Sequence, residues 1–99
     1  MARILIAGCG DVGATLGQGL NAAGHEVWGL KRRPADLPSG IRPLAADLTD
    51  PATLNTLPPD LDAVVYSAAA AGFDEAAYQA AYVAGVRNLL DALRRAGQQ

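Results

Sequence analysis

The feature that most constrains the fold is a glycine-rich hexapeptide between a short apolar run and an amphipathic stretch. The run Arg3 to Ala7 leads into Gly8-Cys9-Gly10-Asp11-Val12-Gly13, which has the form GxGxxG. Apolar or small residues then recur at helical spacing from Asp11 to about Ala23, and Gly24 follows as a stop signal. We therefore expect a buried strand, a tight glycine turn and a helix in direct succession.

The remaining chain alternates short apolar runs with helical and irregular stretches. A proline is tolerated in a strand where the N–H that it lacks would not be needed for a sheet hydrogen bond, so Pro43 does not exclude a third strand. The further expected elements are a strand at Glu26–Leu30, a loop at Lys31–Gly40, a strand at Ile41–Ala45, a short helix from Asp50 to about Leu57, a strand within Leu61–Ser67 and a long helix from Asp74 to Gly97.

This order of elements predicts an α/β protein with a Rossmann-like, doubly wound parallel sheet. Crossovers between parallel strands are right-handed, which restricts the strand order. We expect a partial fold of about four strands in the order 3-2-1-4 with three helices, forming one domain over residues 1–99. A ligand of such a sheet binds at the carboxyl ends of the first and fourth strands, where the glycine turn lies.

The hexapeptide has the residue types that a dinucleotide site needs. Gly8 allows the tight turn, Gly10 lets the backbone approach a pyrophosphate, and Gly13 lets the helix pack on the strand. Free N–H groups at the start of the helix would face the phosphates. The alternative is an ordinary tight turn. The predicted pyrophosphate site consists of Gly8, Cys9, Gly10, Asp11, Val12 and Gly13.

Two side chains of the turn could suggest chemistry but have simpler explanations. Asp11 at the helix start is favoured by the helix dipole, so a capping role is expected. Cys9 could be a reactive thiol, but no base is paired with it in the sequence, and a small residue filling the turn is expected instead. With one cysteine and one histidine, His25, the chain has no cluster of soft metal ligands. No catalytic residue and no metal ligand are assigned.

The end of the second strand favours NADP over NAD. Many NAD-binding domains carry a carboxylate there for the adenosine ribose, whereas this chain has Lys31-Arg32-Arg33. A guanidinium can hold a 2′-phosphate through two parallel charge-assisted hydrogen bonds, which suits Arg32, helped by Arg33 or Lys31. A solvated basic loop is the alternative.

Composition limits the partners. A formal net charge of -2 gives no basic field that would attract nucleic acid. No apolar run reaches the roughly 18–20 residues that a membrane span requires, and Met1 leads within two residues into Ile4-Leu5-Ile6, with no charged region before a long apolar one. We expect a cytoplasmic protein that binds neither nucleic acid nor a membrane.

Several segments together resemble the extended short-chain dehydrogenases/reductases, the NAD-dependent epimerase/dehydratase family, over nearly the whole chain. Ala45 to Asp50 looks like the family's acidic segment after the third strand. The resemblance implies that Asp47, on the adenine amino group, and Leu48 belong to the adenine pocket. Asp62 to Ala69 is similar to the family's fourth strand, whose small residues let the backbone pass close to the cofactor. The matching positions there are Ser67, Ala68 and Ala69.

A third segment, Tyr82 to Leu90, resembles the family helix motif N-V-x-G-T-x-N-L-L, with Tyr82 and Val86 in place of the usual Asn and Thr. The GxGxxG turn is the form seen in atypical members, since most carry GxxGxxG. Relatives commonly dimerise through the corresponding helix. Its apolar stripe therefore predicts a homodimer, and the stripe consists of Tyr82, Val83, Val86, Leu89, Leu90 and Leu93.

The family's chemistry depends on a Tyr-x-x-x-Lys pair beyond the fifth strand, and this sequence contains no such pair. The resemblance thus implies an NADP(H)-binding segment of an oxidoreductase, epimerase or dehydratase, a fragment of a longer protein that is inactive alone. A non-catalytic nucleotide-sensing regulatory domain is the alternative.

Overall fold

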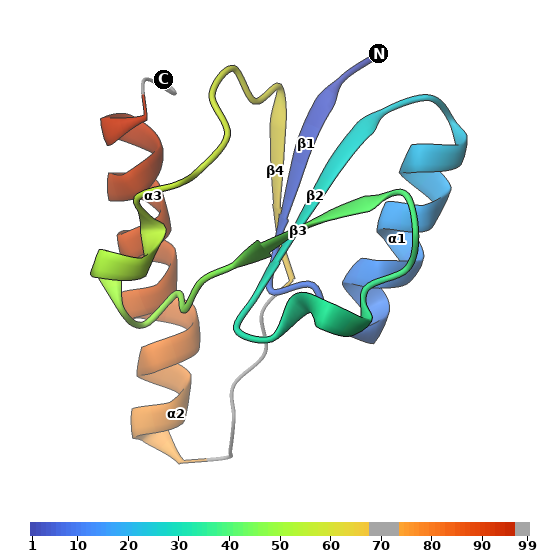
Figure 1. Ribbon diagram of the computed structural model, residues 1–99. Helices are drawn as coiled ribbons and strands as arrows, with labels where there is room; N and C mark the ends of the chain where they lie inside the picture. Colours follow the sequence, from blue (N-terminus) through green and yellow to red (C-terminus); the bar gives the residue numbers. More distant parts are fainter. Residues whose placement is uncertain (68–73, 97–99) are drawn as a thin grey trace.

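The chain folds into a parallel sheet with helices on both of its faces (Figure 1), in a computed structural model that describes residues 1–67 and 74–96. The strand order is β3-β2-β1-β4, which confirms the predicted order and fold class. Ile4 of the central strand pairs with Val27 on one side and with Ala63 on the other. The strands are β1 at Arg3–Ala7, β2 at Glu26–Lys31, β3 at Ile41–Ala45 and β4 at Ala63–Tyr66.

Helix α1 covers one face of the sheet, and helices α2 and α3 lie on the other (Figure 1). Their bounds are Asp11–Ala22 for α1, Glu75–Gln79 for α2 and Gly85–Arg95 for α3. Gly24, predicted to end the first helix, has a φ of 94°, a left-handed conformation that suits glycine. Within the described ranges, no helix has the length and apolar character to cross a membrane.

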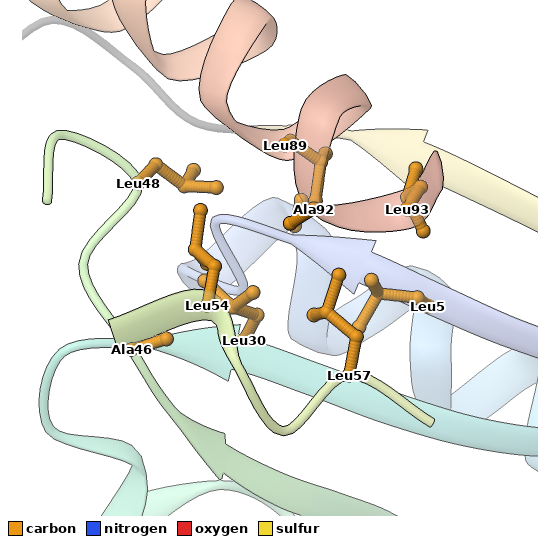
Figure 2. Close-up of a cluster of buried hydrophobic side chains, with 10 residues drawn as sticks. Leu5, Leu30, Ala46, Leu48, Leu54, Leu57, Leu89, Ala92 and Leu93 are labelled. Atoms are coloured by element: carbon orange, nitrogen blue, oxygen red, sulfur yellow. The ribbon is translucent and has the colours of Figure 1, made fainter. Parts of the chain in front are cut away.

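Two separate cores hold these layers together, because successive side chains of β1 point to opposite faces. Ile6 packs with Val27 and Ile41 against α1. Leu5 points the other way, into a larger cluster that includes residues of α3 (Figure 2). β1 is therefore buried on both faces, as its apolar run predicts.

The close approach of α1 to the sheet depends on a small residue. A Cβ atom on Gly17 would lie 2.7 Å from Cδ1 of Ile41, so a side chain at this position would force Ile41 to shift. Pro43 lies within β3 opposite Gly29. It does not break the sheet because β3 is an edge strand with only β2 beside it.

The short helix predicted from Asp50 to about Leu57 is smaller than expected. Only Pro51–Leu54 is helical, as a 3₁₀ turn. Asp50 caps it, accepting a hydrogen bond from the Ala52 N–H at 3.2 Å. The helix cannot continue towards Pro58, since the residue before a proline favours extended backbone. The predicted loop over residues 31–40 also contains a 3₁₀ turn, at Pro34–Asp36.

The last helix is not the continuous element that the sequence predicts. Asp74 caps its start, accepting from the Ala77 N–H at 2.8 Å, but a π-helical turn at Ala80–Ala84 separates α2 from α3. A π turn holds an extra residue per turn and so shifts which side chains face the sheet. Leu89 and Leu93 are buried, whereas three other members of the predicted stripe are exposed, namely Tyr82, Val83 and Leu90. Gly97, the predicted end, lies outside the described residues.

Candidate functional site

A cleft of about 840 Å³ opens at the carboxyl ends of the strands, between the glycine turn, the ends of β2 and β4, the segment after β3 and the last helix. Most residues of the predicted site line it. They are Gly8, Gly10, Asp11, Val12, Lys31, Arg32, Arg33, Asp47, Leu48 and Ser67. The predicted site residues Ala68 and Ala69 lie outside the described residues.

The glycine turn is tied to β2 through its backbone. The N–H groups of Gly8 and Cys9 both donate to the carbonyl oxygen of Leu30, at 2.8 and 2.9 Å, and the Gly10 N–H donates to the Gly8 carbonyl at 2.9 Å. Gly8 has a φ of 83°, which a residue with a side chain rarely adopts. The turn is thus fixed in place before the first residue of α1.

Gly10 and Gly13 have different surroundings. A Cβ atom on Gly13 would lie 3.0 Å from Cγ2 of Ile6, tighter than ordinary contact, so glycine lets α1 pack closely on β1 without displacing this side chain. A Cβ atom on Gly10 would have nothing within 4 Å. The packing of the protein therefore accounts for Gly13 but not for the open space at Gly10, which faces the cleft.

The start of α1 carries no side-chain cap. Gly10 occupies the N-cap position, and no side-chain hydrogen bond closes this end of the helix. Asp11, predicted to cap, is the first helical residue and is exposed, so it acts on the helix through its charge alone. The first N–H groups of α1 are left to bind water or an anion.

Cys9 does not face the cleft. Its side chain is fully buried, and the sulfur lies 2.9 Å from the position that a Cβ atom on Gly29 would take. Burial raises the pKa of the Cys9 thiol, and the charge of Lys31 offsets this only in part. Cys9 is a core residue on the α1 face of the sheet. No group of three or more metal-ligating side chains occurs among the described residues.

Positive charge gathers at the end of β2. Lys31 is held by an ion pair, with Nζ 3.7 Å from Oδ1 of Asp36. Arg32 and Arg33 are exposed at the cleft, and within residues 1–67 and 74–96 neither has an ion-pair partner. These two guanidinium groups are available to an anionic ligand.

Asp47 brings a negative charge to the same edge of the cleft. Its Oδ1 accepts hydrogen bonds from the Thr49 hydroxyl at 2.7 Å and from the Thr49 N–H at 2.9 Å. These two bonds lower the pKa of the Asp47 carboxyl, and the charge of Arg32 adds a smaller effect in the same direction. Asp47 is thus an ionised group, able only to accept hydrogen bonds, at neutral pH.

The sequence did not indicate several residues of the cleft. Tyr66, the last residue of β4, lines it and donates from its hydroxyl to the carbonyl oxygen of Ala81 in the π turn. Burial, and to a smaller extent Tyr82, raises the pKa of Tyr66. The small residues Ala77 and Ala81 recur at helical spacing, a signal that could have placed them on one face. The unpredicted lining residues are Leu30, Ala46, Thr49, Tyr66, Ala77 and Ala81.

Comparison with known proteins points to one family. The sequence profile of the NAD dependent epimerase/dehydratase family matches residues 4–99. A structure described as an NAD-dependent epimerase/dehydratase from Methylobacillus flagellatus is 41% identical, with a TM-score of 0.75 over 99% of this chain and 34% of its own. No match was found among curated proteins.

Two further solved structures were determined with bound nucleotide. A short-chain dehydrogenase/reductase superfamily protein from Agrobacterium tumefaciens with bound NAD is 30% identical, with a TM-score of 0.77 over 98% of this chain and 30% of its own. The Bordetella bronchiseptica enzyme WbmH in complex with NAD+ is 26% identical, with a TM-score of 0.73 over 98% and 36%. The chain thus spans about a third of the length of these three proteins.

Proposed function

This chain belongs to the NAD dependent epimerase/dehydratase family, and from that premise we propose that its cleft binds a nicotinamide dinucleotide, NADP(H) in preference to NAD(H). The open space at Gly10 carries the proposal. No neighbouring atom lies close enough to require glycine at position 10. The free space there adjoins the uncapped start of α1 and leaves room for a pyrophosphate. Two structural relatives with bound NAD or NAD+ support the same class of ligand.

The cleft residues suit the parts of a dinucleotide. The pyrophosphate would lie on the N–H groups at the start of α1, along Gly8 to Gly13, with Asp11 and Val12 beside it. The adenine would lie against Leu48, with its amino group donating to the Asp47 carboxylate. Ser67, with Ala68 and Ala69, would pass close to the other half of the molecule.

The 2′-phosphate of NADP would be held by Arg32 and Arg33. This group adds nearly two negative charges at neutral pH, and guanidinium groups bind it through paired hydrogen bonds. Within the described ranges neither Arg32 nor Arg33 forms an ion pair with a carboxylate, whereas Lys31 already pairs with Asp36. We therefore assign Arg32 the leading role in selecting NADP.

A bound nicotinamide dinucleotide supplies hydride transfer, and the residues of this chain bind and orient it. In the whole protein we propose an oxidoreductase, epimerase or dehydratase. The chain has no Tyr-x-x-x-Lys pair, so the 99 residues by themselves should not oxidise NADPH with any carbonyl compound. A nucleotide-sensing domain is the alternative proposal, and steady turnover by the isolated chain would contradict both.

Calorimetric titration of NADP and NAD against the chain tests the proposal. We expect NADP to bind roughly ten- to hundredfold more tightly, since a bidentate charged contact contributes about 1.5–3 kcal/mol. Arg32→Ala should remove most of this difference and leave NAD affinity nearly unchanged. Arg95→Ala, which removes an exposed guanidinium of α3 outside the cleft, is the matched control. Equal affinities would reject the choice of NADP, and binding of neither nucleotide would reject the site.

We also propose a homodimer through the last helix. Tyr82, Val83 and Leu90 are 51%, 40% and 48% exposed there, a patch of large apolar side chains on a single helical surface. Leu90→Lys should reduce association in sedimentation measurements at about 100 µM, whereas Leu16→Lys on α1, at a residue 40% exposed, should not. A monomer at that concentration would count against the dimer.

A further inference from the structure

We propose that Asn88 is a positioning residue for the adenine end of the dinucleotide, an inference that rests on the proposed function. Asn88 belongs to α3 and is not among the residues that line the cleft. Its Nδ2 donates a hydrogen bond to the carbonyl oxygen of Leu48 at 2.8 Å, across 40 residues of sequence. Leu48 and its neighbours Asp47 and Thr49 do line the cleft.

The segment from Asp47 to Thr49 needs such an anchor because it follows the end of β3 at Ala45 and is not part of the sheet. Thr53 holds one end of it, accepting from the Asp47 N–H at 2.8 Å. Thr53 belongs to the 3₁₀ turn that directly follows in the sequence, so this contact is local. The bond from Asn88 ties the segment to α3, which directly follows the π turn whose residue Ala81 lines the cleft.

The surroundings of this bond restrict how the segment can adjust if it is lost. Leu48 and Leu89 belong to one buried cluster, so the Leu48 side chain is fixed beside α3 (Figure 2). Asn88 itself is half-buried. Removal of the Nδ2 donor would leave a shielded carbonyl without its partner, which favours rotation of the Leu48 peptide group.

A change at the Leu48 peptide would be felt directly at the preceding residue, Asp47. The Asp47 carboxylate is already oriented by Thr49, with Oδ1 holding two hydrogen bonds. A hydrogen bond weakens steeply with distance and angle, so a small displacement of this rigid unit would impair acceptance from the adenine amino group. The pyrophosphate turn at Gly8–Gly13 is built on β2 and would keep its geometry.

The test compares NADP with its deamino analogue, in which hypoxanthine replaces adenine and the amino donor is absent. We expect the unaltered chain to prefer NADP. Asn88→Asp keeps the shape but loses the donor, and Asn88→Ala removes the amide. Each should weaken NADP binding about five- to tenfold and deamino-NADP binding less than twofold, the size expected for one hydrogen bond. Asn88→Gln, which retains an amide donor, should recover part of the preference.

Asn55→Ala is the matched control, because Asn55 Nδ2 also donates to a backbone carbonyl, that of Ala52 at 2.9 Å, but within its own turn. It should leave both affinities unchanged. Equal weakening of the two nucleotides by the Asn88 variants, or no preference in the unaltered chain, would overturn the inference and leave Asn88 a structural residue. If NADP does not bind the unaltered chain at all, the proposed function fails first. If Asn88→Ala does not fold, Asn88→Asp and Asn88→Gln give the same comparison.

Discussion

Cγ2 of Ile6 lies 3.0 Å from the position that a Cβ atom on Gly13 would occupy, so an alanine there would force Ile6 to move by a few tenths of an ångström. Three residues earlier, Gly10 has nothing within 4 Å of the same position. The two glycines of this motif therefore have different explanations. Gly13 serves the packing of the fold, and Gly10 serves the proposed ligand.

Substitutions at these glycines should separate stability from binding. Gly13→Ala should lower the free energy of unfolding by about 1–3 kcal/mol through overpacking, measured by urea denaturation. Gly10→Ser should leave that free energy equal or higher, because serine is a favourable N-cap and the Gly10 backbone is extended. It should nevertheless weaken NADP binding at least tenfold (about 1.4 kcal/mol), since the hydroxyl takes an N–H group from the pyrophosphate.

Gly19→Ala is the control for both measurements. Gly19 lies in the interior of α1 with open space around it, so alanine should stabilise the chain by about 0.5–1 kcal/mol. NADP affinity should stay the same. If Gly10→Ser destabilised the fold as much as Gly13→Ala while binding remained intact, the assignment of Gly10 to the ligand would be wrong.

The carboxyl of Asp47 should report on its two hydrogen bonds from Thr49. Thr49→Val removes the hydroxyl donor, so the pKa of Asp47 should rise towards its ordinary value, measured by carboxyl-carbon NMR titration. A pKa lowered by folding adds stability above the ordinary value of about 4, and that stability is lost as pH falls through the lowered pKa. Thr49→Val should therefore lower the free energy of unfolding at neutral pH and leave it nearly unchanged below the lowered pKa of Asp47. Thr56→Val, at an exposed position nearby, is the control and should not lower the free energy of unfolding at neutral pH. An unchanged Asp47 titration in Thr49→Val would show that the Thr49 hydroxyl does not lower the pKa of Asp47.

Loss of the Tyr66 hydroxyl should loosen the π turn. Tyr66→Phe removes the bond to the Ala81 carbonyl and should cost about 1 kcal/mol of stability, since the bond is partly shielded. Amide exchange over residues 80–84 should become faster relative to α1, which serves as the internal reference. Uniform acceleration throughout the chain would show that the bond does not act locally.

Cys9 should behave as a core residue rather than as a reactive thiol. Its burial and raised pKa both oppose thiolate formation, so thiol reagents should label it only through unfolding. The labelling rate should rise with urea in parallel with unfolding, and Cys9→Ala should leave NADP affinity unchanged. Rapid labelling of the native chain would contradict this placement.

The strands and α1 could be predicted because their signals are local. A five-residue apolar run before a glycine turn, and Gly24 after a helical pattern, fix β1 and α1 without reference to the rest of the chain. The π turn could not be predicted in this way. Its sequence, Ala80 to Ala84, suits an α-helix equally well, and Tyr66, which bonds into it, lies 15 residues from Ala81 in sequence.

In the site, too, some features could be predicted from the sequence and others could not. The positions of Gly10, Arg32 and Asp47 at one cleft follow from where parallel strands end. The part played by Asn88 does not, because its partner Leu48 is 40 residues away. The burial of the Cys9 side chain in the core could not be predicted either. The GxGxxG pattern fixes the backbone of the turn but does not determine on which face of the sheet its second side chain lies.

The central place of β1 also has a consequence for how the chain reaches its native state. Arg3 at its start bonds Glu26 across 23 residues but Asp62 across 59 residues. Closing the longer loop costs roughly 0.8 kcal/mol more in chain entropy, so β2 should join β1 before β4 does. Until then one edge of an apolar strand stands open to other chains. Refolding yield should therefore fall as protein concentration rises, even under conditions where the native state is stable.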